Sequence, residues 1–369
     1  MKPLVAPHIA ALEPDAPGRP PAHVARDLGI AQLVPLASNE NPLGPSPRVR
    51  AAMLAGIEQI HRYPDHTSHE LRERLASHYR VPPDELALGH GSNSLIELIA
   101  QTFATPEEHA IIGAPSFSCY RASLAAAHVP TTVVPLRDGL YWDLDAVQSA
   151  VRPETKLIFL DNPGNPVSVH VPGHALQAFT RDLSPHVVLV IDEAYAEFAD
   201  APDFASALGM LELRERLIVL RTFSKAYALA GLRVGYAIAQ RALIARMAAM
   251  RVPFTISSLA QLAATAALDD AAHLLQTIEH NARERSRVTQ RLQQEGLFLP
   301  DSQTNFLLVA LRRAAAPIHR ALLERGLLTQ LPGPMLLEHL RVSIGLEHEN
   351  ELLVRNLLEV LESKHSDLG

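Results

Sequence analysis

Residues 221–236 read Arg221-Thr-Phe-Ser-Lys-Ala-Tyr-Ala-Leu-Ala-Gly-Leu-Arg-Val-Gly-Tyr236. The 369-residue chain has four lysines, and Lys225 is the one that lies in this ordered segment. Lysine, unlike arginine, forms a Schiff base with a carbonyl once its amine is desolvated or lies near another cation. Ser224 precedes it and Arg233 follows eight residues later. The segment therefore predicts a carbonyl-binding lysine beside a phosphate site.

Length and composition favour a soluble globular protein of more than one domain. A chain of 369 residues is long enough for two domains, or for one large domain with a smaller companion. Its 47% apolar and 20% charged residues are typical of globular proteins. The formal net charge of −7 argues against broad electrostatic attraction to nucleic acid. Cys119 is the only cysteine, which excludes an internal disulfide and a multi-cysteine metal site.

The N-terminal sequence and the histidines bear on whether the protein is secreted, spans a membrane or binds a metal. The first eight residues contain no apolar core of signal-peptide length, and no run of about 18 apolar residues predicts a membrane span. We therefore expect a cytoplasmic enzyme. His66 and His69 lie near His61, but their spacing matches no metal-binding motif, and no metal is expected.

Helical and strand-like patterns alternate after a proline-rich start. Residues 1–47 predict an irregular arm. Helices are expected at Arg48–Ile60, Ser68–Tyr79 and Ser94–Phe103, where apolar residues recur at helical spacing. The Ala- and Leu-rich stretch Ala242–Leu275 is also expected to be helical.

Short apolar runs between the helices predict a buried parallel sheet. They are β-branched and bounded by Pro, Asp or Gly, which is typical of buried strands in βαβ units. The runs are Ala110–Gly113, Thr131–Pro135, Leu157–Leu160, Val187–Ile191 and Leu217–Leu220. Strands near Asn305–Val309 and Arg341–Ile344 predict a smaller α+β part. The expected fold class is α/β, with a mostly parallel mixed sheet between helices in a large domain (48–250) and a small domain (1–47 and 251–369).

The run Val187–Ile191 leads directly into Asp192 and, three residues later, Tyr195. Ligands in open α/β sheets bind beyond the carboxyl ends of strands, so Asp192 is expected to face a site. A carboxylate there would hold a pyridine nitrogen protonated and make the ring an electron sink. Tyr195 would donate its phenol to a ring oxygen. The alternative is that Asp192 only caps a following helix.

Two turns carry further polar groups. Asn165 lies in Asp161-Asn-Pro-Gly-Asn-Pro166, where two X-Pro steps fix the direction of its amide, although a simple surface turn fits the pattern too. Gly91-Ser-Asn-Ser94 opens a predicted helix, and its free N–H groups and hydroxyls suit a phosphate. Plain helix capping by Ser92 or Asn93 is the alternative there.

Taken in order, these segments resemble the fold-type I pyridoxal-phosphate (PLP) aminotransferases, and most closely the histidinol-phosphate aminotransferase family. The resemblance covers nearly the whole chain. Its motifs follow one another as a glycine-serine turn, an Asn-Pro turn, a strand with Asp-x-x-Tyr, and a Ser-Lys pair followed by arginine. Further matching segments are Ala37-Ser-Asn-Glu-Asn-Pro-Leu-Gly44, Arg62-Tyr-Pro-Asp65, Pro253-Phe-Thr-Ile-Ser-Ser258 and Leu340-Arg-Val-Ser-Ile-Gly345.

The resemblance implies a role for each matching residue. Lys225, Asp192 and Tyr195 are the expected catalytic residues: the lysine binds the cofactor aldehyde and later moves a proton, the aspartate pairs with the ring nitrogen, and the tyrosine contacts the ring hydroxyl. The other expected cofactor-binding residues are Ser92, Asn93, Ser224 and Arg233 at the phosphate, Asn165 at the ring hydroxyl, Tyr120 stacked on the ring, and Tyr63, which reaches the phosphate from the second subunit of a homodimer. Arg341 and Asn41 are the expected substrate-binding residues.

Three departures from the family pattern concern the substrate. The family's Asn-Pro-Asn-Asn-Pro-Thr-Gly turn is Asn162-Pro-Gly-Asn-Pro-Val-Ser168 here, which keeps Asn165. Asp15 takes the place of a tyrosine and Gln330 the place of an arginine, and in the family these two residues help to bind the substrate phosphate. A dianionic phosphate prefers several charge-assisted donors. The substrate is therefore less well defined than the cofactor.

The resemblance implies a PLP-dependent aminotransferase that exchanges an amino group between histidinol phosphate and 2-oxoglutarate in histidine biosynthesis. One alternative is an aminotransferase for aromatic or other amino acids, favoured by Asp15 and Gln330. Another is a carbon–carbon lyase similar to threonine-phosphate decarboxylases. A regulator that binds the cofactor without turnover is a third, but nothing before residue 37 resembles a helix-turn-helix. The expected partners are small-molecule donors and acceptors and a second copy of the chain, with no nucleic acid and no membrane.

Overall fold

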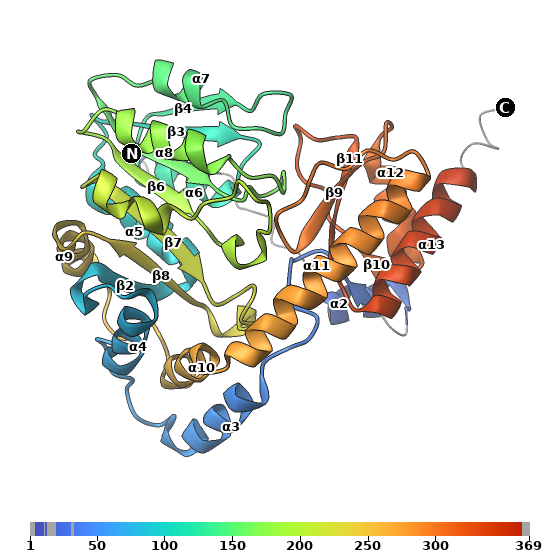
Figure 1. Ribbon diagram of the computed structural model, residues 1–369, viewed down its shortest axis with the longest axis horizontal. Coiled ribbons are helices and arrows are strands. Elements are labelled where there is room, and N and C mark those ends of the chain that lie inside the picture. The colour runs from blue at the N-terminus through green and yellow to red at the C-terminus, as the bar shows by residue number, and fades with distance from the viewer. Residues whose placement is uncertain (1–3, 11, 13–19, 31–32, 364–369) are drawn as a thin grey trace.

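The computed structural model describes residues 4–10, 12, 20–30 and 33–363. It has a large body built on one sheet and a smaller body formed by the C-terminal part of the chain. Helix α11 (Ala271–Gln294) runs from the first body to the second (Figure 1). None of the described helices is long and apolar enough to cross a membrane.

A seven-stranded sheet forms the centre of the large body. Its spatial order is β2-β8-β7-β6-β5-β3-β4. Strand β8 runs antiparallel to both of its neighbours and all other pairs are parallel, so the predicted mixed, mostly parallel sheet is confirmed. The strands are β2 (Leu86–His90), β3 (His109–Ala114), β4 (Thr131–Pro135), β5 (Thr155–Asp161), β6 (Val188–Asp192), β7 (Leu217–Thr222) and β8 (Val234–Ala239).

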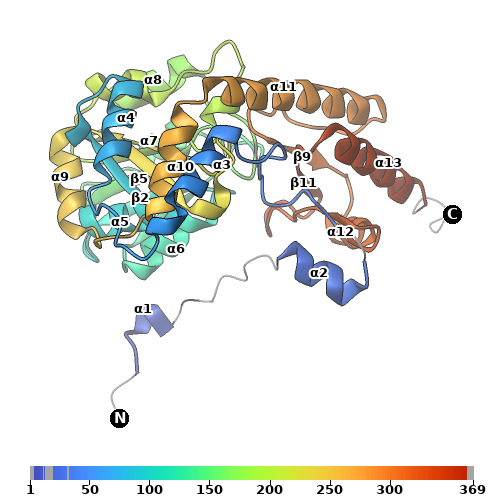
Figure 2. The ribbon, with the colours of Figure 1, turned by 90° about the horizontal axis from the view of Figure 1, so that it is seen from below.

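Helices cover both faces of this sheet, as the view from below shows (Figure 2). On one face lie α5 (Gly91–Phe103), α6 (Ser118–Ala126) and α9 (Arg241–Met250). On the other lie α7 (Leu144–Ser149) and α8 (Gly173–Asp182). Short 3-10 turns complete the connections: η1 (Ile57–Gln59), η2 (Pro83–Glu85), η3 (Ala196–Phe198), η4 (Ala207–Leu213) and η5 (Ala230–Leu232).

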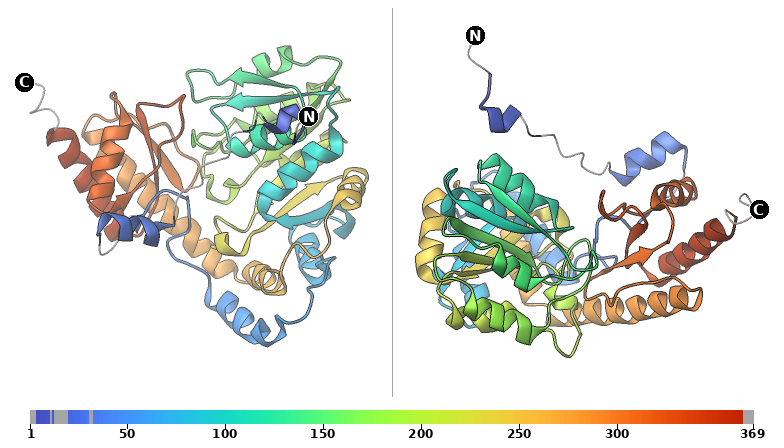
Figure 3. Two further views of the ribbon diagram at one scale, coloured as in Figure 1. Left: turned by 180° about the vertical axis from the view of Figure 1, so that it is seen from behind. Right: turned by 90° about the horizontal axis from the view of Figure 1, so that it is seen from above.

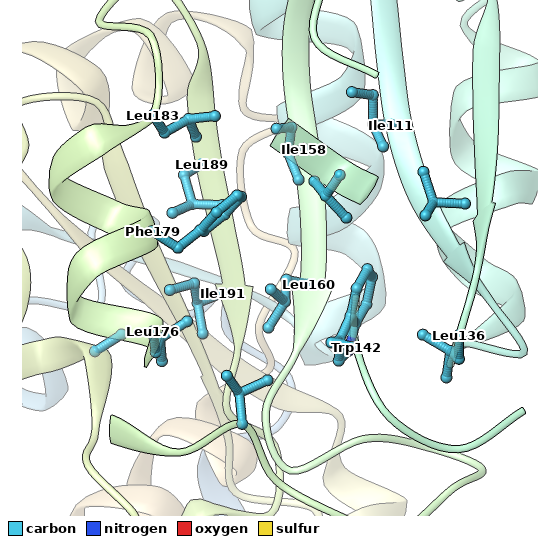
Figure 4. Packing of buried hydrophobic residues seen from close by; sticks show 14 of the residues in the cluster. Ile111, Leu136, Trp142, Ile158, Leu160, Leu176, Phe179, Leu183, Leu189 and Ile191 are labelled. Atoms are coloured by element: carbon cyan, nitrogen blue, oxygen red, sulfur yellow. The ribbon is translucent and has the colours of Figure 1, made fainter. Parts of the chain in front are cut away.

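Side chains of the central strands alternate between two apolar cores, because successive residues of a strand point to opposite faces. Leu160 of β5 and Ile191 of β6 belong to the core on the α7/α8 side, which Figure 4 shows together with Trp142. The residues that follow them, Asp161 and Asp192, therefore lie toward the other face. The period of two thus puts both carboxylates on one face of the sheet, at the carboxyl ends of two neighbouring strands.

A third group of helices packs against the β2 edge of the sheet. It consists of α3 (Pro47–Gly56), α4 (His69–Tyr79) and α10 (Ser258–Leu268). Ser46 caps α3 by accepting a hydrogen bond from the Val49 N–H, and Pro47 occupies the first turn, where its missing N–H costs nothing.

The region expected to be helical from Ala242 to Leu275 is interrupted twice. Residues 251–257, which include Pro253, separate α9 from α10, because proline lacks the N–H that a helix interior requires. Asp270 ends the second interruption and caps α11 through a bond from the His273 N–H. The prediction of helix is correct for most of the stretch and wrong at these breaks.

Two strands of the central sheet were not predicted from the sequence. β2 contains Ala87 and Gly89, and β8 contains Gly235 and two alanines; neither glycine nor alanine favours strands. β8 nevertheless lies inside the sheet between β2 and β7, and β2 pairs with it at the edge, so strand pairing and burial outweigh local preference. The five apolar runs that were predicted as strands are strands in the structure.

The small body is an α+β arrangement around its own apolar core. It contains β9 (Phe306–Ala310) antiparallel to β11 (His339–Ser343), with α12 (Ala315–Glu324) and α13 (Glu347–Ser363) beside the end of α11. The N-terminal arm joins it where β1 (Val34–Pro35) pairs with β10 (Leu327–Leu328). Helix α2 (Pro21–Leu28), in blue, lies beside the orange and red small body in both views of Figure 3, whereas α1 (Pro7–Ala10) contacts the large body near α6.

The packing suggests a different domain boundary from the one expected at residue 250. Helix α10 buries Ala260, Ala263 and Ala264 against the large sheet and not against the small core. We therefore propose that the large domain extends through α10 and that the boundary lies within α11, whose C-terminal half contributes Val288 and Leu292 to the small core.

Candidate active site

A cavity of about 330 Å³ lies at the carboxyl ends of the parallel strands. Strands β5, β6 and β7 end beside it at Asp161, Asp192 and Thr222, and α5 begins beside it after β2. This is where ligands bind in open α/β sheets. All residues predicted for the site line this cavity except Asn41 and Tyr63.

Lys225 lies in the turn after β7, with its amine in the cavity. The Nζ atom donates a hydrogen bond to the Ser38 carbonyl at 3.1 Å and lies 5.6 Å from the centre of the Tyr195 ring. Burial, helped by the positive charges of Arg341 and Arg233, lowers the pKa of this amine to about 8. A larger fraction is then neutral near pH 7, and the neutral amine is the form that attacks a carbonyl.

Asp192 ends β6 inside the cavity with 4% of its surface exposed. The Tyr120 hydroxyl donates to its Oδ2 at 2.9 Å and the Ala194 N–H donates to its Oδ1 at 3.1 Å. Burial raises the pKa of Asp192 to about 6, while these two bonds and the charge of Lys225 oppose the shift. A cation against this carboxyl would keep it ionised, because an opposite charge favours the charged form.

Tyr195 presents a hydroxyl that is held from two sides. The side-chain amides of Asn39 and Asn165 donate to it at 3.0 and 3.3 Å. Burial raises the pKa of Tyr195 to about 12, although Arg341 opposes the shift. The phenol therefore keeps its proton, and since both amides act as donors, that proton stays available for an acceptor in the cavity.

The first turn of α5 and the turn after β7 form an anion-binding corner. Ser92 and Asn93 occupy that first turn, where helix N–H groups lack partners. Opposite them, Arg233 donates to the Ser224 Oγ at 3.0 Å and to the Ala230 carbonyl at 3.1 Å. Both acceptors are neutral, so within the described residues this guanidinium bonds to no carboxylate.

Two glycines allow this corner to close. Gly91 has a φ of +75°, a left-handed conformation that other residues rarely adopt. A Cβ on Gly235 would lie 2.4 Å from the Ser92 nitrogen. The backbones of β8 and α5 thus approach more closely than any side chain permits, which brings the N–H groups of α5 next to Arg233.

Besides Tyr195, two aromatic residues line the cavity, Tyr120 and Phe117. Tyr120 is fully buried, stacks on Phe159 with ring centres 5.2 Å apart, and uses its hydroxyl on Asp192. Phe117, which the sequence analysis missed, is half-buried at the cavity with its ring perpendicular to that of Tyr120. Tyr120 thus holds the carboxylate of Asp192, and Phe117 presents a second ring to the cavity.

Arg341 of β11 brings a cation from the small body into the cavity. Its Nη1 donates to the Asn165 Oδ1 at 2.8 Å and its Nη2 to the Ala37 carbonyl at 2.6 Å. The buried Nε has no hydrogen-bond partner among the described residues. Burial lowers the pKa of Arg341. A partly buried guanidinium whose partners are neutral attracts an anionic ligand.

The donor set fits PLP group by group. The corner of α5 and Arg233 suits a phosphate dianion, and the glycines leave the space that its close approach requires. Asp192 suits a protonated ring nitrogen, and Lys225 suits an aldehyde. The hydroxyl of Tyr195 suits a ring oxygen.

Behind the cavity a buried ionic cluster joins the two segments that carry its key residues. Arg221, on β7, donates to Glu193 at 2.9 Å, to Glu197 at 2.9 Å and to Ser206 at 3.1 Å. Glu193 and Glu197 lie in the loop that holds Asp192. One guanidinium therefore fixes the loop after β6 against the strand that leads to the lysine.

Two predicted residues lie elsewhere in the single chain. Asn41 does not line the cavity, because its amide donates to the Ala226 carbonyl at 3.0 Å and to Thr277 at 3.2 Å. The neighbouring Asn39 takes the place at the site. Tyr63 is 85% exposed and packs its ring against Phe254.

Known proteins resemble this chain in sequence and in structure. The family described as aminotransferase class I and II matches residues 31–359. A histidinol-phosphate aminotransferase 2 from Hydrogenovibrio crunogenus is 38% identical over 98% of this chain and 97% of its own length. One from an Anaeromyxobacter species is also 38% identical, over 97% and 99%. The crystal structure of the Sinorhizobium meliloti histidinol-phosphate aminotransferase with pyridoxal-5'-phosphate superposes with a TM-score of 0.90, at 28% identity over 98% of this chain and 99% of that one.

Proposed function

This chain belongs to the class I and II aminotransferase family, and we propose that its amino donor is histidinol phosphate and its acceptor 2-oxoglutarate. The cofactor is PLP. The donor is proposed from relatives that match nearly the whole chain. One observation carries the assignment to this site: the amine of Lys225 shares a cavity with the carboxylate of Asp192 and the guanidinium groups of Arg233 and Arg341. A cytoplasmic location is part of the proposal.

In this proposal a separate set of residues binds each polar group of the cofactor. Ser92, Asn93, Ser224 and Arg233 would hold the phosphate, Asp192 the ring nitrogen, and Tyr195 with Asn165 the ring hydroxyl. Phe117 would lie on the ring face. Arg341 would bind the anionic end of the substrate, because its guanidinium already bonds to Asn165 beside the ring hydroxyl.

PLP, when bound, supplies an electron sink that stabilises negative charge on the substrate carbon bearing the amine. The Lys225 Nζ would take the proton from that carbon and deliver it one position away. Its lowered pKa of about 8 suits this task, because a general base works best when its pKa lies near the working pH. Tyr195 would keep its proton throughout and hold the ring oxygen in position.

The residues at the substrate end of the cavity are also compatible with a second candidate function. Gln330 pairs with Arg341 through backbone hydrogen bonds of 3.0 and 2.9 Å, and its exposed side chain bonds to the Leu331 carbonyl. It brings no cation to the site, so Arg341 is the one guanidinium at this end within the described residues. Asp15 lies outside them. A single guanidinium also suits a carboxylate, which favours an amino-acid aminotransferase as the alternative.

Parallel half-reactions with histidinol phosphate and phenylalanine test the donor. We expect the second-order rate constant to be about 100-fold higher for histidinol phosphate, followed through the absorbance of the cofactor. Arg341→Gln should weaken binding of both donors, because each presents an anion to that guanidinium. A preference for phenylalanine would establish the alternative, and release of carbon dioxide would indicate a lyase.

We also propose that the protein is a homodimer in which Tyr63 reaches the partner's cofactor phosphate. Exposed apolar side chains occur in the segment that precedes this tyrosine and beside its ring contact Phe254: Leu54 is 71% exposed, Ile60 61% and Val252 67%. A surface of that kind is typical of a protein interface. Light scattering should give twice the chain mass of 40.2 kDa. Leu54→Asp should yield monomers with weakened PLP binding, whereas a wild-type monomer with full PLP affinity would contradict the proposal.

A further inference from the structure

Two carboxyl groups lie at the carboxyl ends of the central strands, beside the proposed site of the cofactor ring. Asp161 ends β5 and Asp192 ends β6, and the two residues are direct partners in the parallel pairing of these strands. Side chains at paired positions of neighbouring strands point to the same face. Each residue is 4% exposed, and both line the cavity. The proposed function uses Asp192 and leaves Asp161 without a role.

The hydrogen bonds of Asp161 connect it to two parts of the site. The indole Nε1 of Trp142 donates to its Oδ1 at 3.2 Å, and the Asn165 N–H donates to its Oδ2 at 2.9 Å. Asn165 in turn bonds to Tyr195 and Arg341. The carboxyl is therefore attached to the turn that links the ring hydroxyl to the substrate end. Neither donor is charged, so nothing in its hydrogen-bond shell neutralises an anion.

The titratable groups around Asp161 are mostly acids. Asp192 faces it from β6, Tyr120 from α6 and Tyr195 from the loop after β6. The cation Lys225 acts on Asp192. Burial raises the pKa of Asp161 to about 7, and the negative charge of Asp192 adds to the shift, against the two N–H donors. Ionising both of two adjacent buried carboxyls carries a large electrostatic cost, because like charges repel one another strongly at low dielectric.

We propose that Asp161 is a second acid of the cofactor site, which holds a proton while Asp192 carries the charge that faces the ring nitrogen. The pair then presents one anion to one ring cation at neutral pH. Above neutrality Asp161 ionises, adds a second negative charge beside Asp192 and tightens its hold on the turn that carries Asn165. Asp161 is a positioning residue in this scheme. The inference rests on the proposed function only for the identity of the bound ring.

A fluorescent residue of the chain can report whether Asp161 is protonated. Trp142 is the only tryptophan in the sequence, and its indole N–H donates directly to Asp161. Figure 4 shows the indole within the apolar core, between Leu136 and Leu160, the residue that precedes Asp161. Ionisation of the accepting carboxyl changes the electrostatic field at the indole. Tryptophan emission therefore follows the protonation of Asp161 without any catalysis.

The test is a fluorescence titration of the full-length chain, freed of PLP, between pH 5 and 9. Wild type is expected to show a transition with its midpoint near 7. Asp161→Asn should abolish it. Asp192→Asn should move it down by about one pH unit, because a neighbouring anion is removed. Asp143→Asn is the matched control: it removes the carboxyl next to Trp142 in sequence but keeps a side chain that caps α7, and the transition should persist.

Persistence of the transition in Asp161→Asn, or no movement in Asp192→Asn, would overturn the proposal. A second readout is the ratio of PLP dissociation constants of wild type and Asp161→Asn, which should change across the same pH interval and would contradict the proposal by staying constant. Should Asp161→Asn fail to fold, the Asp192→Asn titration still decides. The titration is independent of turnover, so a protein without aminotransferase activity that titrates as expected would refute the proposed function alone.

Discussion

Lys225→Ala is expected to abolish transamination and covalent capture of PLP while leaving the chain folded. The lysine amine is the nucleophile for the aldehyde and the base that moves the proton, and a positioned base alone contributes up to about 10⁴-fold in rate. No other lysine of the described chain lines the cavity. Borohydride reduction followed by peptide mass spectrometry should place the cofactor on residue 225 in wild type and nowhere in the variant. Half-reaction rates should fall by about 10⁴-fold or more.

Lys156→Ala is the control for this experiment. Lys156 pairs with Glu108 at 3.5 Å, is 31% exposed and does not line the cavity, so its removal should leave activity within about two-fold. Retained turnover in Lys225→Ala would contradict the mechanism. In wild type the rate of PLP capture should also rise with pH and level off above about 8, because the neutral amine is the reactive form and burial lowers its pKa to that value.

The sequence was sufficient for those parts of the site that follow from local pattern and sheet topology. Lys225, Asp192 and Ser92 each follow a strand or open a helix, and parallel strands bring such ends together at one edge. The same rule would have placed Asp161 there, since it too follows an apolar run. It was overlooked because it was read as part of a turn.

The contributions of distant segments could not be derived in this way. Asn39 bonds to Tyr195 across 156 residues and Arg341 bonds to Asn165 across 176. Both contacts depend on how the arm and the small body fold back over the sheet, and no periodicity in the chain encodes that. Asn39 and Asn41 are two positions apart in one motif, and the left-handed φ of 55° at Asn39 helps decide which amide faces the cavity.

Arg221→Met is expected to cause the largest loss of stability of any substitution near the site. Arg221 is 6% exposed and holds Glu193, which is fully buried, and Glu197. Removing one partner of a buried ionic cluster leaves uncompensated charge and costs about 3–5 kcal/mol of unfolding free energy. Burial already raises the pKa of Glu197 in the presence of the arginine. Without it the folded state favours the protonated carboxyls further, so the loss should be greatest above neutral pH and shrink as pH falls.

Urea unfolding of three further variants separates the loss of the buried cluster from the simple loss of a positive charge. Arg241→Met breaks an exposed pair with Asp84 at 2.7 Å and should cost less than about 1 kcal/mol. Adding Glu193→Gln and then Glu197→Gln to Arg221→Met should restore part of the stability, because each removes a buried negative charge. Since the cluster ties the loop after β6 to β7, the triple variant should regain stability and still bind PLP more weakly than wild type. Full recovery of PLP affinity would show that Asp192 and Lys225 keep their places without the cluster, and that it serves stability alone.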